Sequence, residues 1–542
     1  MGLNNGETGA MPRQNSSASA AAAGRRDLLK TGVAGATLGV FGLPHEGQAQ
    51  RRGSGRIVFA NGSAYDTMDP HVTFDVGRVP YRLNCYDSLL RWLDNPPKLE
   101  PWLAESYAVS DDGKRYTFKL RAGVKFHDGS PLTAADVVYS MERILAVKKG
   151  AYPLFAPLIA PGSTKALDGR TVEFNLTTAS AIFAAITHDI YVVNSALVKR
   201  NERSGDWGQE WISSNDAGSG SYIIRRFDPA RGFLASRFDN HFLGPAGLAE
   251  IDFRYVAEVN SRVLGLIRGD FQGTDPYMPI DQIQRLQADP NMNVMSAEST
   301  RLFYATMHFE RPPLNDVNFR KALCYCFDYD GWINNILSGS VVRNTHVIPN
   351  PMWGAPKDVA GYSYDIDKAK WHLAKVQAPL REIVVAGMIG YEQSMQAAAL
   401  LQNGMTRAGI QSRLLNEPFP VVSNKMRDPA QMYDVLFLWR STYYADPHNW
   451  AGELLHSNRR GGGNASFYSN PEIDRLLDQA LATADQEKRA PLYEQVARIS
   501  SEDAAGIYIH NTKWFGPFRK NVSGVRFCPI GDGQGMRSLN IA

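Results

Sequence analysis

The sequence lacks the short motifs that most often mark an enzyme's active site. It contains no phosphate-binding P-loop, no HExxH zinc motif, no GxSxG nucleophile turn and no glycine triplet of a dinucleotide-binding fold. The 11 histidines show no metal-ligand spacing. Asp446, His448 and His456 lie near one another in the sequence, but we expect them to be loop residues rather than metal ligands. The sequence therefore predicts no catalytic residue, no metal site and no cofactor.

Cysteine is scarce as well, with 4 residues in a chain of 542. They are Cys85, Cys324, Cys326 and Cys528, and no CxxC motif is present. Cys324 and Cys326 are two positions apart on an expected helix, so their side chains point to different sides and should not pair. Four scattered cysteines do not demand a disulfide framework even in an oxidising compartment, and we expect buried free thiols.

The chain also has little surplus charge and no long hydrophobic run. A net charge of +3 on 542 residues excludes a dedicated nucleic-acid binder. The mildly apolar run near the N-terminus, residues 31–43, is too short to span a bilayer as a permanent helix. The length predicts two or three domains.

The first 49 residues have the features of a cleaved export signal. Arg25 and Arg26 precede the weakly apolar run, and Gly47 and Ala49 supply the small residues of a cleavage site. The arginine pair and the low hydrophobicity resemble the twin-arginine type of signal peptide. We therefore expect the mature protein in the periplasm.

The segment 104–145 has the clearest local pattern. Tyr116, Phe118 and Leu120 alternate with polar residues, as in a strand with one buried face, and a turn at 110–113 makes this strand part of a hairpin. Thr133 is the expected N-cap of a following helix, with Asp136 three residues on as an acidic variant of the capping box. These residues predict structure and carry no chemistry of their own.

The same segment closely resembles the signature of the family 5 solute-binding proteins, the extracytoplasmic receptors of peptide- and nickel-type ABC importers. The matching residues are 103–106, 112–113, 116–121, 123–129 and 133–140. The resemblance implies an α/β, type II periplasmic-binding-protein fold with two lobes, a hinge and an additional small domain. It places lobe 1 in residues 56–98, 216–301 and 509–542, the additional domain in 99–215, and lobe 2 in 302–508.

Strand and helix patterns in the second lobe support this expectation. An apolar strand at 383–386 is followed by a helix over 393–408, a terminating Gly409 and a strand at 410–415. Elements of these lengths predict a βαβ unit with two parallel strands. The chain would cross between the lobes near residues 302 and 508, and two crossings make a hinge beside a cleft.

The segment 439–450 is the candidate ligand site. It follows the expected strand 433–439 directly, and ligands of open α/β sheets bind beyond the carboxyl ends of strands. Its aromatic residues offer flat apolar walls, and its single acid offers a partner for an ammonium group. We predict ligand contact for Trp439, Tyr443, Tyr444, Asp446 and Trp450.

This segment also resembles the D-P-D-N-F region in which the family's peptide receptors hold the amino terminus of the ligand. Asp446, Pro447 and Asn449 match that pattern, and His448 stands in place of the second acid. A competing interpretation is that Asp446 caps a helix that starts at Pro447, since Asp followed by Pro is a good helix start.

The resemblance implies a receptor and not an enzyme. It would bind a small peptide or similar polar solute between the lobes and deliver it to the transmembrane subunits of an ABC permease, with no nucleic-acid partner and as a monomer. One alternative is a receptor of the same family for a metal chelate, an oligosaccharide or an opine. A secreted hydrolase is the remote alternative, which the missing nucleophile and metal motifs oppose.

Overall fold

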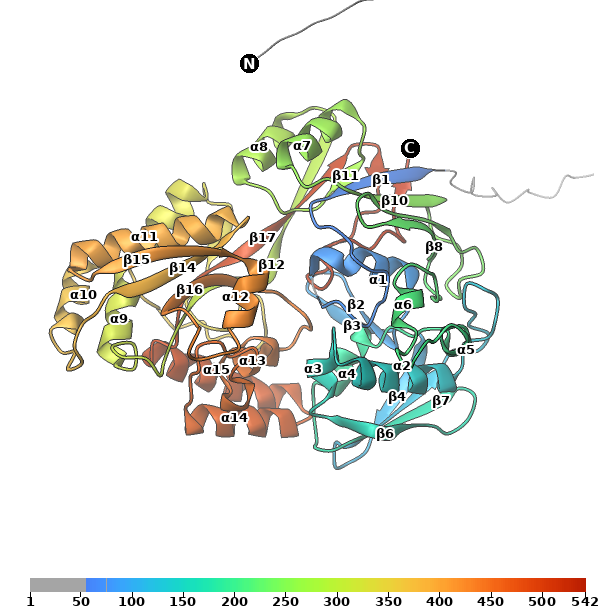
Figure 1. Cartoon of the computed structure of the whole chain (residues 1–542), viewed down its shortest axis with the longest axis horizontal. Coiled ribbons are helices and arrows are strands. Elements are labelled where there is room, and N and C mark those ends of the chain that lie inside the picture. Colours follow the sequence, from blue (N-terminus) through green and yellow to red (C-terminus); the bar gives the residue numbers. More distant parts are fainter. Residues whose placement is uncertain (1–54, 75) are drawn as a thin grey trace, which may run out of the picture. The chain divides into compact units, whose positions relative to one another are not determined.

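The computed structural model describes residues 55–74 and 76–542, and the predicted signal peptide, residues 1–49, lies outside them. A mixed sheet of 11 strands runs through these residues (Figure 1). Its strands, in spatial order, are β15 (Ser412–Pro418), β14 (Ile383–Ile389), β16 (Val435–Arg440), β12 (Met292–Met307), β17 (Gly506–Arg519), β11 (Gly273–Thr274), β1 (Arg56–Asn61), β10 (Glu250–Tyr255), β9 (Gly232–Arg237) and β8 (Tyr222–Asp228), with β13 (Val341–Arg343) paired to β17.

Two long strands, β12 and β17, connect the two parts of this sheet. They pair antiparallel from Met292–Arg519 to Thr306–Gly506, with a shift in register between Glu298 and Leu302. We call the part with β1 and β8–β11 the first lobe, and the part with β13–β16 and the helices packed on it the second lobe. The two lobes are therefore joined by hydrogen-bonded strands and not by single flexible segments.

The second lobe contains the predicted βαβ unit. Strand β14 pairs in parallel with β15, and α11 (Glu392–Ala408) connects them. Gly409 ends this helix with a φ of 87°, a left-handed conformation that glycine adopts without strain. The expected parallel pair and the helix end at Gly409 are both confirmed.

The family signature folds into a second, four-stranded sheet with a helix beside it. The strands are ordered β4 (Ala104–Val109), β5 (Arg115–Leu120), β7 (Thr171–Leu176) and β6 (Ile159–Ala166), and α2 (Ala134–Val147) packs against them. Tyr116, Phe118 and Leu120 are buried, as their alternation predicts. The Thr133–Asp136 capping box is present, and the Thr133 backbone N–H donates to the Asp136 carboxylate at 2.9 Å.

The remaining elements are helices of 4 to 17 residues, short 3-10 or π-helical segments and two small strand pairs. The helices are α1 (Val79–Cys85), α3 (Tyr152–Phe155), α4 (Phe183–Ile186), α5 (Ser195–Arg200), α6 (Gln209–Ile212), α7 (Val259–Arg268), α8 (Ile280–Ala288), α9 (Val317–Cys326), α10 (Ile366–Leu373), α12 (Phe419–Lys425), α13 (Ala451–Leu455), α14 (Pro471–Ala482) and α15 (Gln486–Glu502). The strand pairs are β2 (Leu90–Leu93) with β3 (Lys98–Pro101), and β18 (Val522–Ser523) with β19 (Asn540–Ile541). Over residues 55–74 and 76–542, no helix is long and apolar enough to cross a membrane.

The four cysteines are free thiols. Cys85, Cys324 and Cys326 are buried, as expected, whereas Cys528 is partly exposed. Burial raises the pKa of Cys324, Cys326 and Cys528 to about 12, so all three thiols stay protonated at neutral pH.

Candidate ligand-binding cleft

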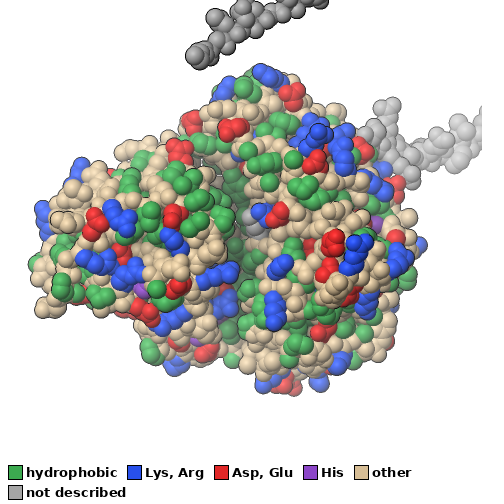
Figure 2. Space-filling model, in the orientation of Figure 1, with side chains coloured by type: hydrophobic (Ala, Val, Ile, Leu, Met, Phe, Trp, Pro, Cys, Tyr) green, Lys and Arg blue, Asp and Glu red, His purple; other side chains and the backbone are tan. Residues whose placement is uncertain are grey.

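A groove separates the second lobe from the rest of the molecule in the space-filling view, with the second lobe on the left (Figure 2). The segment 439–450, which begins in the last two residues of β16, forms contacts across this groove. His188 Nε2 donates to the backbone oxygen of Tyr443 at 2.6 Å. The Ala181 backbone N–H donates to the Leu481 oxygen at 2.8 Å. The second lobe thus meets residues 181–188, next to the four-stranded sheet, at the candidate site.

Trp439, the first predicted site residue, lies at the junction of the lobes. It pairs with Phe303 of β12, and the two rings are 4.6 Å apart. Its other ring neighbour is Tyr391, at 6.0 Å. Its side chain is only partly buried.

Tyr443 contacts the first lobe directly. Its ring stacks on Phe74 with 4.4 Å between centroids and 11° between planes. The guanidinium of Arg440 lies over the same ring, 4.9 Å from its centroid. Tyr443 is partly buried and, like Trp439, is positioned where the lobes face each other.

Tyr444 and Trp450 are both completely buried. Tyr444 packs into the hydrophobic core built mainly by residues 89–192, and Trp450 into a core of the second lobe. Their side chains therefore fix the segment 439–450 to the cores on either side of it.

Asp446 caps the short helix that starts at Pro447, as the competing interpretation predicted. Its side chain accepts a hydrogen bond from the His448 backbone N–H at 3.0 Å, at the start of the short helix Pro447–Asn449. It also forms a two-point ion pair with Arg489 of α15, at 2.8 and 2.9 Å. Burial lowers the pKa of Arg489, and the Asp446 carboxylate raises it. The net shift of the Arg489 pKa is upward. The charge of Asp446 is already paired within the protein.

Arg301, on β12, was not identified from the sequence. Its guanidinium lies between two aromatic rings, 5.1 Å from the centroid of Tyr277 in the first lobe and 5.2 Å from that of Trp439 in the second. Its Nε atom is buried and has no hydrogen-bond partner within the described part of the chain. No local pattern reveals this site, because Tyr277, Arg301 and Trp439 are far apart in sequence.

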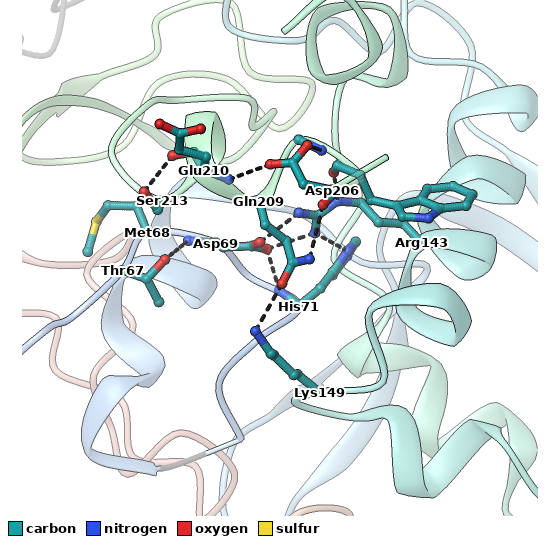
Figure 3. Close-up of polar contacts among 12 residues, drawn as sticks. Thr67, Met68, Asp69, His71, Arg143, Lys149, Asp206, Gln209, Glu210 and Ser213 are labelled. Carbon is teal, nitrogen blue, oxygen red and sulfur yellow. Dashed lines mark hydrogen bonds and ion pairs between the residues drawn. The ribbon is translucent and has the colours of Figure 1, made fainter. Parts of the chain in front are cut away.

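A polar cavity of about 600 Å³ lies next to the Phe74–Tyr443 contact, since Phe74 is part of its wall. None of the five predicted site residues lines it. Beside it, Lys149 Nζ donates to Gln209 Oε1 at 3.1 Å (Figure 3). Its lining residues are Asp66, Thr67, Asp69, Val72, Thr73, Phe74, Arg78, Lys149, Gln209, Glu210 and Ser213.

A buried ion pair supports one wall of this cavity. Arg143 binds Asp69 through two contacts of 2.6 and 2.8 Å and donates to His71 Nδ1 at 3.0 Å (Figure 3). Burial, and secondarily Arg143, lowers the pKa of His71 to about 4. His71 is therefore neutral at pH 7, and its Nε2 donates to the Tyr191 oxygen at 2.7 Å. These groups satisfy one another and serve as a rigid support.

Comparison with known proteins identifies the class. A model of the bacterial extracellular solute-binding proteins, family 5, matches residues 98–462. The probable D,D-dipeptide-binding periplasmic protein DdpA of Escherichia coli (strain K12) is 29% identical over 486 residues, which are 88% of this chain and 92% of that protein.

Two solved structures share the fold. One is the ABC transporter-associated periplasmic binding protein DppA of Helicobacter pylori with the peptide STSA, at a TM-score of 0.80 and 21% identity, covering 91% of this chain and 99% of that one. The other is the binding protein AgaA of A. tumefacien R10 with agropinic acid, at a TM-score of 0.77 and 22% identity, covering 90% and 99%.

The chain belongs to the bacterial extracellular solute-binding proteins, family 5, because the family model matches more than half of its length. The predicted type II periplasmic-binding-protein fold is confirmed. The family assignment also confirms the predicted class, an extracellular solute-binding protein. The family consists of binding proteins, and its relative DdpA is named a periplasmic protein.

Proposed function

We propose that this receptor binds a small peptide or similar polar solute in the cleft between its lobes and presents its closed form to the transmembrane subunits of an ABC permease. The observation that carries the proposal is the position of Trp439 and Tyr443. Both belong to the segment that begins in the last two residues of β16, both residues are partly buried, and both have partners at the junction of the lobes. The named specificity of DdpA supports a peptide-like ligand.

The five predicted site residues divide into two roles in this proposal. Trp439 and Tyr443 contact the ligand through their rings, which offer stacking area for apolar and planar groups. Tyr444, Asp446 and Trp450 hold the segment in place, because they are buried and Asp446 is ion-paired. The mature protein acts as a monomer.

The four-stranded sheet marks one part of the chain, whereas the two lobes share the 11-stranded sheet. We propose a first lobe of residues 56–98, 216–301 and 509–542, an additional domain of residues 99–215 and a second lobe of residues 302–508. Support comes from the hydrophobic cores: one is built mainly by residues 89–192 and two by residues 302–509. Leu89, Leu90 and Tyr444 in the first core, and Ile509 in one of the others, fall outside the proposed ranges.

Ligand screening combined with solution scattering tests the receptor proposal. A bound peptide should raise the melting temperature of the mature protein through mass action and reduce its radius of gyration through closure of the lobes. The peptide should be recovered intact by mass spectrometry, which separates a receptor from a hydrolase. A ligand that binds tightly and leaves the radius unchanged would contradict a hinged cleft.

A non-peptide solute is the second candidate. It is favoured by AgaA, a protein of the same fold with agropinic acid bound, and by His448 in place of the second acid of the family pattern. Mass spectrometry of solute that co-purifies from the native host decides between the two, because a peptide gives amide-bond fragments and an opine or chelate does not.

Export by the twin-arginine route is the remaining part of the proposal. Replacing Arg25 and Arg26 together by Lys should leave the precursor in the cytoplasm, which immunoblotting of cell fractions would detect. Normal periplasmic yield from this double variant would assign the signal peptide to the general export route.

A further inference from the structure

A second cavity, of about 410 Å³, lies outside the cleft between the lobes. Among the described residues, none from 302–508 lines it, so the second lobe takes no part in its wall. The wall includes the end of α1, most of β2 and the C-terminal segment 526–538. Ligand pockets in proteins commonly have volumes of about 300–1,000 Å³, and this cavity falls within that range.

Aromatic and aliphatic side chains form a large part of this wall. Trp92 Nε1 donates to the Ala185 backbone oxygen at 3.1 Å, and Trp102 Nε1 donates to Asp87 Oδ1 at 2.7 Å. Because the polar atom of each indole already has an acceptor, the two rings offer apolar surface to a ligand. The aliphatic lining residues are Leu83, Leu93, Leu243, Pro245 and Ile530. Walls of this kind suit a mainly apolar molecule.

Gln534 lines the same cavity with a side-chain amide that is buried and unused. The residue is 1% exposed, and neither Oε1 nor Nε2 has a hydrogen-bond partner within the described part of the chain. Gln534 is the only described residue with two such atoms. Its backbone is held in place, since its N–H donates to the Gly531 oxygen at 3.0 Å and its oxygen accepts from Asn84 Nδ2 at 2.9 Å. A buried amide without partners costs free energy, so a ligand that pairs with it is stabilising.

The three arginines of the wall already have partners in the protein. Arg526 forms an ion pair with Asp94 at 2.6 Å. Arg91 and Arg537 each donate to backbone oxygens. Burial lowers the pKa of both guanidinium groups, and the carboxylate of the buried Asp87 opposes this shift. The polar group that the protein leaves unpaired in this cavity is therefore the neutral amide of Gln534.

We propose that this cavity is a second binding site, for a small, uncharged and mainly apolar ligand that carries a planar lactam or carboxamide edge. In the bound state the ligand N–H donates to Gln534 Oε1, and the ligand carbonyl oxygen accepts from Gln534 Nε2. Interchanging the two amide atoms of Gln534 leaves the same requirement, one donor beside one acceptor. The inference is independent of the proposed function, because it does not depend on which solute the cleft binds.

Matched fragments test this edge by ligand-observed NMR titration of the mature protein. The first set contains lactams such as oxindole, the second their N-methylated forms, which lack the donor, and the third hydrocarbons such as indane, which lack both groups. The anion 2-naphthoate tests whether the arginines select a charged ligand instead. The lactams should bind, and the N-methylated forms should bind roughly 5- to 150-fold more weakly, because one buried polar atom of Gln534 stays unpaired.

Variants assign the effect to Gln534 and to this cavity. Gln534→Leu removes both amide groups at similar size, so it should abolish the preference for lactams over their N-methylated forms. Gln396→Leu makes the same change at an exposed position of α11 and should keep the full preference. Trp439→Ala alters the cleft and should leave lactam binding unchanged. Melting curves without fragment show whether each variant is folded, and Gln534→Met gives the same measurement if the leucine variant unfolds.

A preference for lactams that is lost in Gln534→Leu and kept in Trp439→Ala supports the second site. Equal binding of lactams and their N-methylated forms, binding of 2-naphthoate alone, or no binding by any fragment overturns it. Lactam binding that Trp439→Ala abolishes also overturns it, because the fragment would then occupy the cleft. None of these outcomes decides the receptor proposal, which depends on solute binding and lobe closure.

Discussion

Asp446 belongs to the segment 439–450 and Arg301 contacts it through Trp439, but the two charged side chains differ in how far their polar atoms are paired. Asp446 is deeply buried and has a cap hydrogen bond, a two-point partner in Arg489 and the Tyr493 hydroxyl at 3.4 Å. Arg301 is partly buried, lies between two rings and has no acceptor for its Nε. An acid among aromatic residues is therefore weak evidence for ligand binding unless its charge is still unpaired.

Removing the ion-pair partner of Asp446 should have the largest effect on the stability of the protein. In Arg489→Met the buried carboxylate loses its counter-charge, and the free energy of unfolding should fall by about 3–5 kcal/mol. Denaturant unfolding measures this loss. Arg498→Met, on the same helix, breaks an ion pair with Asp358 that is largely exposed and should cost less than about 1 kcal/mol. Equal losses in the two variants would contradict the structural role of Asp446.

Removing the charge of Asp446 while keeping the shape of its side chain should reduce stability by a smaller amount. Asp446→Asn retains an acceptor for the cap, and Arg489 keeps hydrogen bonds to the Ala480 oxygen and the Tyr493 hydroxyl, both at 3.0 Å. We expect a loss of about 1–3 kcal/mol in stability and no change in ligand affinity. Calorimetry with the identified ligand checks the second part, and a large drop in affinity at unchanged stability would return Asp446 to the binding site.

Acid should destabilise the junction through His510. The unfolded chain protonates this residue near pH 6.5, whereas the folded protein resists protonation until about pH 3. The free energy of unfolding should therefore fall as the pH decreases below about 6.5, by up to about 1.4 kcal/mol per pH unit from His510 alone. His510→Asn should reduce this slope between pH 6.5 and 5. An unchanged slope would mean that His510 is not neutral beside Arg301.

The smallest effect on stability should come from removing the contact between Arg301 and the aromatic rings beside it. A double-mutant cycle of Trp439→Phe and Arg301→Gln isolates the interaction of the cation with the indole face, which we expect to contribute about 0.5–1 kcal/mol. Denaturant unfolding of the four proteins gives the coupling energy. A coupling indistinguishable from zero would indicate that the guanidinium leaves the rings in solution.

Much of the fold could be predicted because its signals are local. The Thr133–Asp136 cap spans three residues, and the end of α11 at Gly409 depends on one backbone conformation. The charge of the cleft could not be predicted in this way. Asp446 and Arg489 are 43 positions apart, and Arg301 meets its two rings only after β12 pairs with β16 and residues around 277 pack beside it. Residue type identified Asp446 as charged, but only the fold shows which charges are already paired.

Gly218 is a single residue whose role also depends on a contact that the local sequence does not reveal. The sequence shows two glycines, Gly218 and Gly220, but not which distant backbone they approach. In the structure a Cβ at Gly218 would lie 1.9 Å from the Cys85 backbone oxygen, and one at Gly220 would lie 2.5 Å from the Cys85 carbonyl carbon. The backbone passes too close for any side chain, which is a contact between distant segments.

The pairing of β12 with β17 also limits how the protein can move. Two strands that hydrogen-bond along most of their length behave as one ribbon, which resists sliding and shearing but can twist. The ladder is interrupted between Glu298 and Leu302, and twisting costs least where its hydrogen bonds are missing. Arg301 lies inside that interruption. We therefore expect a rotation of one lobe against the other to be centred on this interruption, where a small change in backbone angle becomes a large displacement at the far edges of the lobes.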